Sequence, residues 1–201
     1  MVAIAAADEK VKPTPLTPRA PLVKQVKPAQ RPGVDHPLPA GALTGVGKAH
    51  VVMTPAQEQA AIQRKYDDLS RFMMMKDGPH LSQLFRALTP PEFSYTDIHK
   101  KRFTRDELIA QISHQMAIVK RVSLATNRVA SWSSAKGVGK AKVVSGYKMV
   151  FATKAKNGKT TASVLQGEST SLDTWVKSRT GWKLKSVVSL KDSAKLNGKP
   201  L

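Results

Sequence analysis

The stretch Thr170-Ser-Leu-Asp-Thr-Trp175-Val-Lys-Ser-Arg-Thr-Gly181-Trp182-Lys-Leu-Lys-Ser-Val-Val188 decides the fold. It predicts two antiparallel strands with one tryptophan each, because Arg179-Thr180-Gly181 is typical of a tight turn between strands. In the second strand Trp182, Leu184 and Val188 share one face, while lysines point the other way. We therefore expect a sheet with one apolar face and one basic face.

The residues before this stretch predict further antiparallel strands. Apolar and polar residues alternate over residues 143–151, and Asn157-Gly158 indicates a type I′ hairpin turn into a long strand over residues 160–177. A strand of that length must bend or bulge, and Gly167 is the expected place. Residues 131–142, rich in Gly, Ser and Lys, are expected to be a mobile loop.

Three helices are expected before the sheet. The first begins at Thr54, where Thr54, Pro55 and Gln57 form a capping signature. Asp77-Gly78-Pro79 ends it, and a short second helix stops at Thr89 before two prolines. Thr104 and Glu107 have capping-box spacing and begin the third. The apolar stripe of the first helix consists of Ile62, Tyr66, Leu69 and Met73.

Two motifs carry a family resemblance. Phe103-Thr-Arg-Asp-Glu-Leu-Ile109, together with the Asp-x-Trp strand that precedes Gly181-Trp-Lys-Leu184, resembles the nuclear transport factor 2-like superfamily, in particular its SnoaL-like and ketosteroid isomerase-like bacterial members. The resemblance implies an α+β fold of the cystatin-like type, with a cone-shaped curved antiparallel sheet wrapped around N-terminal helices. That domain is expected over residues 53–191, followed by a flexible tail over residues 192–201.

Residues 1–52 are expected to be a disordered tether. The first fifty residues hold eight of the thirteen prolines and no Phe, Trp or Tyr, so they cannot bury enough apolar surface to offset their ordering entropy. The alanine-rich start, Val2 to Ala7, looks like the remnant of a signal peptide. An exported or periplasmic protein is therefore favoured over a cytoplasmic one.

Three titratable residues are candidates for catalysis. If the strand that contains Tyr95 continues to His99, then Asp97 and His99 could point into the cone. A buried Asp173 could act as a general base, because burial raises the pKa of a carboxyl group. The structural alternatives are a turn-forming Asp97, a solvated His99 and an ion pair between Asp173 and a basic strand neighbour. We favour these alternatives over an isomerase, cyclase or dehydratase.

A pocket inside the cone would be lined by aromatic side chains, which could also simply fill a small core. The candidates are Tyr66, Phe72, Phe93, Tyr95, Tyr147, Trp175 and Trp182. The leading hypothesis is a module that binds a small apolar or amphipathic molecule, or that serves assembly, without turning over a substrate.

No cofactor or metal is expected. Gly137-Val-Gly-Lys140 lacks the first glycine of a phosphate-binding loop and has alanine where Ser or Thr should bind magnesium. The five histidines show no metal-ligand spacing, and the chain has no cysteine. No apolar run is long enough to span a membrane.

The charge distribution suggests partners. The net charge of the chain is +19, and residues 108–201 hold seventeen Lys or Arg against three Asp or Glu. A basic sheet could contact a polyanion non-specifically. Superfamily members often dimerise through the outer face of the sheet, which implies a homodimer, but lysines on alternate strand positions would bring like charges together.

Overall fold

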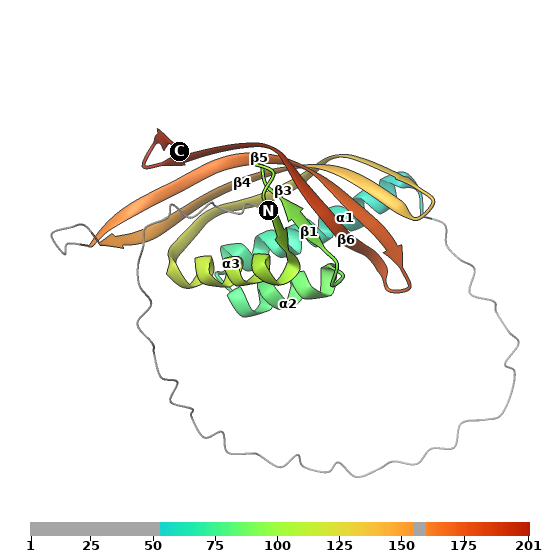
Figure 1. The fold of residues 1–201 in the computed structure, drawn as a ribbon, viewed down its shortest axis with the longest axis horizontal. Coiled ribbons are helices and arrows are strands. Elements are labelled where there is room, and N and C mark those ends of the chain that lie inside the picture. Colours follow the sequence, from blue (N-terminus) through green and yellow to red (C-terminus); the bar gives the residue numbers. More distant parts are fainter. Residues whose placement is uncertain (1–52, 155–159) are drawn as a thin grey trace, which may run out of the picture. The chain divides into compact units, whose positions relative to one another are not determined.

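The computed structural model describes residues 53–154 and 160–201, and the expected tether and the Asn157-Gly158 turn lie outside these residues. Three helices lie on one side of a curved sheet (Figure 1). No helix within the described ranges is both long and apolar enough to cross a membrane. The elements are α1 (Pro55–Met74), α2 (Gly78–Leu88), β1 (Ser94–Thr96), β2 (Arg102–Thr104), α3 (Arg105–Ile118), β3 (Val119–Ala135), β4 (Val138–Lys154), β5 (Thr160–Ser178), β6 (Gly181–Leu196) and β7 (Lys199–Pro200).

The predicted helix starts are confirmed. Thr54 and Gln57 form a capping box at α1, and Thr104 and Glu107 form another at α3. At α2 the Asp77 side chain accepts a hydrogen bond from the backbone N–H of His80. Each cap satisfies backbone donors that the first helical turn leaves free, so the sequence itself determines where the helices begin.

The sheet has the strand order β2-β1-β6-β5-β4-β3, with β7 paired to β6. Neighbouring strands are antiparallel except β1 and β6, which are parallel. Helix α1 crosses the edge strand β3. There the Gln63 side chain accepts from the Val129 N–H at 2.8 Å and donates to the Asn127 carbonyl at 2.7 Å. One glutamine thus satisfies one donor and one acceptor of this edge strand.

The expectation of a mobile loop over residues 131–142 is wrong. This segment forms the end of the β3–β4 hairpin, with a turn at Lys136 and Gly137, whose φ angles are 49° and 77°. Two positive φ angles are what a type I′ turn requires. The hairpin end is also held to α1, because Ser134 Oγ donates to the Glu58 carboxylate at 2.6 Å. A sequence rich in Gly and Ser is ordered here by tertiary contacts.

Strand β6 differs from the expected face pattern because it carries an extra residue at Lys185. Thr174 of β5 pairs with Ser186, whereas Trp175 pairs with Leu184. A bulge of this kind shifts the side chains that follow it to the other face, here as far as the second register shift at Leu190. Trp182 and Leu184 are buried as expected, but Val187, not Val188, continues the buried row.

Residues 192–201, expected to be a flexible tail, instead continue the sheet. Strand β6 pairs with β5 as far as Leu196, and β7 folds back onto β6. The turn between them is Asn197-Gly198, with φ angles of 51° and 82°. This dipeptide is a type I′ hairpin signal, like the one recognised at residues 157–158.

The long strands have two distinct faces. The inner face points toward the helices and carries the buried side chains of Val143, Tyr147, Asp173 and Trp175. The outer face carries the alternate residues, among which are the exposed Lys140, Lys142 and Lys148 of β4. The apolar face and the basic face predicted from the sequence are therefore present.

Gly167 does not produce a bulge between β4 and β5, because these strands pair without a register shift. It leaves room for its neighbours. A Cβ atom at this position would lie 2.4 Å from the Ser193 carbonyl oxygen and 2.6 Å from the Tyr147 hydroxyl.

Gly167→Ala is therefore expected to destabilise the domain by about 1–2 kcal/mol, because backbone and a buried ring must shift. Urea denaturation would measure the change. Gly146→Ala is the matched control, since its Cβ would lie 3.0 Å from the Thr126 hydroxyl, which belongs to an exposed side chain that can rotate. Equal unfolding midpoints for the two variants would contradict the close approach at Gly167.

Candidate ligand-binding site

The inner face of the sheet places a carboxylic acid against a tyrosine. Asp173 of β5 is 2% exposed, and the Tyr66 hydroxyl of α1 donates a hydrogen bond to its Oδ2 atom. Burial raises the pKa of Asp173 above its usual value. Burial and the neighbouring Asp173 also raise the pKa of Tyr66 well above the usual range. The basic ion-pair partner expected for Asp173 is replaced by a neutral phenol.

Further polar groups line the same interior. The hydroxyl groups of Tyr95 and Ser189 lie 2.9 Å apart and are hydrogen-bonded. Burial, reinforced by the negative charge of Asp192, raises the pKa of Tyr147 to about 12. Asp192 also has a raised pKa because it is partly buried. Burial in this interior therefore favours the protonated, neutral forms of these side chains.

The interior of the cone is nearly full. Phe93, Trp175 and Trp182 are all buried, and the Trp175 ring packs edge-on against Tyr66 with ring centroids 5.7 Å apart. The cavity between Tyr66 and the helices measures about 20 Å³. That is room for about one water molecule. Its lining residues are Tyr66, Leu69, Met73, Leu81, Ile112, Gln115, Met116 and Asn127.

The remaining aromatic candidates for the pocket also pack against other side chains. Tyr95 and Tyr147 are buried among the inner strands, and the Tyr95 ring lies 5.9 Å from that of Phe103. Phe72 is half-buried near the end of α1 and stacks on His80 with ring centroids 5.8 Å apart. These side chains mainly build the core.

Asp97 and His99 do not join Asp173. Strand β1 ends at Thr96, and the Asp97 carboxylate accepts hydrogen bonds from the backbone N–H groups of His99 and Lys101 at 2.8 and 2.9 Å. His99 is exposed. The structure thus places Asp97 as a turn-forming residue, one of the alternatives considered from the sequence.

No three His, Asp or Glu side chains gather as a metal site in the part of the chain that the structure describes.

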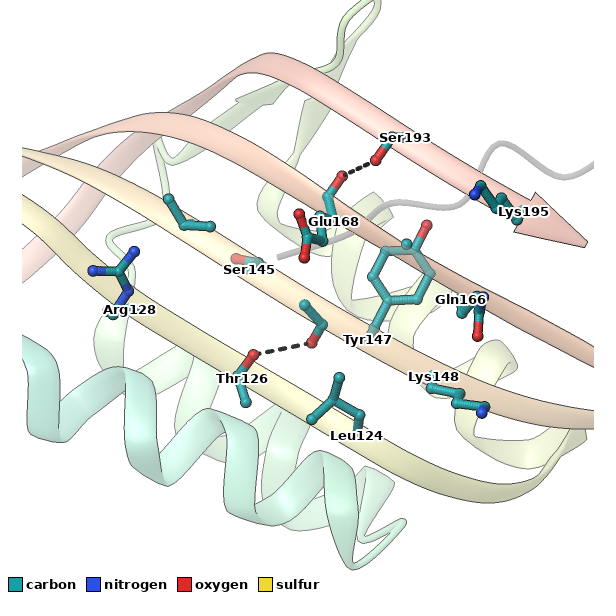
Figure 2. A pocket seen from close by; sticks show the side chains of 13 residues that line it. Leu124, Thr126, Arg128, Ser145, Tyr147, Lys148, Gln166, Glu168, Ser193 and Lys195 are labelled. Atoms are coloured by element: carbon teal, nitrogen blue, oxygen red, sulfur yellow. Dashed lines mark hydrogen bonds between the residues drawn. The ribbon is translucent and has the colours of Figure 1, made fainter. Parts of the chain in front are cut away.

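A much larger hollow lies on the outer face of the sheet. This outer trough has a volume of about 770 Å³ and crosses four strands (Figure 2). It is lined by Leu124, Thr126 and Arg128 of β3, Val144, Ser145, Gly146, Tyr147 and Lys148 of β4, Gln166, Gly167 and Glu168 of β5, and Ser193 and Lys195 of β6. Its volume lies within the usual range for small-molecule sites, about 300–1,000 Å³.

The trough exists because three of the four residues in one row of the outer face have small side chains. Strand pairing places Thr126, Gly146, Glu168 and Ser193 side by side across the four strands. The hydroxyl of Thr126 donates to the Gly146 carbonyl at 3.4 Å, and that of Ser193 donates to the Glu168 carbonyl at 3.3 Å (Figure 2). These hydroxyls bond to main chain, so the space above Gly146 stays open.

Cations dominate the lining of the trough. Arg128, Lys148 and Lys195 come from three different strands, whereas Glu168 is the only acid among the lining residues. The exposed Leu124 and the half-buried Val144 add apolar surface. Sequence reasoning found the basic face but missed the trough, because only strand register shows that Gly146 stands beside Thr126 and Ser193.

The helical layer inside a curved, mostly antiparallel sheet makes this an α+β fold, as expected from the sequence. No family model matches the sequence, and no curated protein matches it. Solved structures that are similar to this one include proteins described as nuclear transport factor 2-like, the superfamily that the motifs resemble.

Three solved structures illustrate the similarity. A protein of the superfamily from Salmonella enterica is 15% identical, with a TM-score of 0.47, and the match covers 68% of this chain and 92% of that one. A member from Cytophaga hutchinsonii is 11% identical, with a TM-score of 0.49, over 65% and 95% of the two chains. A protein from Kribbella flavida is 11% identical, with a TM-score of 0.52, over 69% and 95%. Identities this low indicate a shared fold and carry no function with them.

Proposed function

We propose that this domain is a small-molecule-binding module, and that its ligand is an anionic amphipathic molecule held in the outer trough. The observation that carries the proposal is the position of the open space. The trough offers about 770 Å³, whereas the cavity at Tyr66 offers about 20 Å³. A ligand of ordinary size fits the first volume and not the second.

The lining of the trough supports this ligand class. Arg128, Lys148 and Lys195 can donate charge-assisted hydrogen bonds to a carboxylate or a similar anionic group. Leu124 and Val144 offer apolar surface to an alkyl chain or ring, and their burial would contribute about 25 cal/mol per Å². An anionic head and an apolar body would therefore each find a complementary part of the trough.

The isomerase or cyclase alternative finds less support. It requires an acid and a base that converge on a space large enough for a substrate. Asp173 and Tyr66 do converge, but the cavity beside Tyr66 has about 20 Å³. Asp97 and His99 lie in a surface turn.

A homodimer through the outer face would bring the three trough cations of one copy toward those of another. With one acid in each trough, the net repulsion would oppose that contact in dilute salt. A polyanion has the correct sign of charge. It would differ from a small amphiphile in its binding, because each phosphate contact adds to the salt dependence.

The experiment is a calorimetric titration of the domain with decanoate, below the concentration at which decanoate forms micelles. The double variant Arg128→Glu/Lys148→Glu is expected to bind decanoate at least about tenfold more weakly, because attraction becomes repulsion at two positions. Arg179→Glu in the β5–β6 turn, which makes one such charge reversal away from the trough, is the control and should leave the affinity unchanged.

Two results would overturn the proposal. One is an absence of decanoate binding by the unmodified chain. The other is an equal loss of affinity in Arg179→Glu, which would indicate a general effect of net charge instead of a site. Binding of a long polyphosphate in place of decanoate, with steep weakening by salt, would support the polyanion alternative.

A further inference from the structure

The outer trough contains one carboxylate, that of Glu168, which forms no ion pair with the described residues. Glu168 lies on the outer face of β5 and is exposed. The two other acids of strands β3–β6, Asp173 and Asp192, belong to the rows that alternate with it: Asp173 is buried against Tyr66, and Asp192 pairs with the buried Ser169. Glu168 is thus the single acid on the outer face of these strands in the described residues.

Strand register places no cation directly opposite Glu168. Its direct neighbours across the sheet are Gly146 on β4 and Ser193 on β6, which carry no charge. Lys148, Lys191 and Lys195 are its diagonal neighbours, at Cα distances of about 7–8 Å for such pairs, which long side chains can span. Among the residues that the structure describes, no cation lies within 4.0 Å of the Glu168 carboxylate.

The space beside Glu168 is also open. Gly146 has no side chain, and the Ser193 hydroxyl is engaged with the Glu168 main-chain carbonyl at 3.3 Å. Neither neighbour supplies a donor to the carboxylate. A ligand that brings its own N–H donor can therefore reach Glu168 while its anionic group contacts Lys148 or Lys195.

We infer that Glu168 determines specificity in the trough, which selects zwitterionic amphiphiles whose amine lies a few bonds from a carboxylate. This inference rests on the proposed function. A purely anionic amphiphile satisfies the cations but places a second negative charge near Glu168. An N-alkyl amino acid offers its carboxylate to the cations and its N–H donors to Glu168, so both signs of charge in the trough find a partner on the same ligand.

The experiment compares two probes of similar alkyl length, decanoate and N-decylglycine, in calorimetric titrations of the full chain. The unmodified chain is expected to bind N-decylglycine about fivefold more tightly than decanoate. In Glu168→Gln the affinity for N-decylglycine should fall by about fivefold, whereas that for decanoate should rise by about twofold because a repulsion is removed. Glu92→Gln, an exposed acid outside the trough, should change neither affinity.

Opposite shifts for the two probes would support the inference, since general damage to the fold would weaken both. Equal affinity of the unmodified chain for the two probes would overturn the inference and leave the proposed function standing. If neither probe binds, both the inference and the proposed function are overturned.

Discussion

Trp175→Ala is expected to destabilise the domain by about 3–5 kcal/mol, the usual cost of removing a fully buried large aromatic side chain. Trp175 is 0% exposed and packs edge-on against Tyr66 with ring centroids 5.7 Å apart. Its loss would leave a cavity where β5 meets α1, and the long strands on either side cannot easily collapse into it. Urea denaturation, followed by the fluorescence of the remaining tryptophans, would measure the change.

Val176→Ala is the matched control, because the next residue along β5 is only half-buried and lies on the outer face. It should cost less than about 1 kcal/mol. A Trp175→Ala variant as stable as Val176→Ala would mean that the tryptophan does not fill the cone. The open interior would then need to be reconsidered as a ligand site.

Tyr66→Phe is expected to destabilise the domain by about 2–3 kcal/mol at pH 7, although it removes one oxygen atom. The Tyr66 hydroxyl donates to Oδ2 of Asp173, which is 2% exposed. Hydrogen bonds to charged groups are worth about 1.5–3 kcal/mol, and a buried carboxylate that loses its donor regains no water. Because burial raises the pKa of Asp173, the cost should become smaller as the pH is lowered and protonation of the carboxyl removes the charge. A loss that is independent of pH would contradict this role.

Asp173→Asn tests the same pair through the pH dependence of stability. Burial raises the pKa of Asp173 in the folded state, so the folded state holds this proton more tightly than the unfolded state does. The resulting stabilisation is complete below the unfolded pKa and is lost as pH rises through the folded pKa. The asparagine does not titrate. Its stability relative to the unmodified chain should therefore improve between pH 4 and pH 7, and parallel pH profiles would be inconsistent with a raised pKa.

The sequence by itself determined those parts of the structure that depend on residues close together along the chain. Capping boxes at Thr54 and Thr104 fix the starts of α1 and α3, because the interacting groups are three residues apart. Alternation of apolar and polar residues over residues 143–151 predicted the strand that is β4, and the Asn157-Gly158 signal predicted the long strand β5 after it. The order of helices and strands, together with the tryptophan motifs, indicated the α+β class and the superfamily resemblance.

Tertiary structure alone decided which residues meet. The bulge at Lys185 moves Val188 off the inner face, and only the pairing of β5 with β6 shows it. Asp173 accepts a hydrogen bond from Tyr66, which lies 107 positions away along the chain, and does not form the expected ion pair with a basic strand neighbour. The outer trough depends on Gly146 standing beside Thr126 and Ser193, and Asp97 turns away because β1 ends at Thr96. Contacts between distant segments follow from strand register and helix packing, and neither can be read from local patterns in a single sequence.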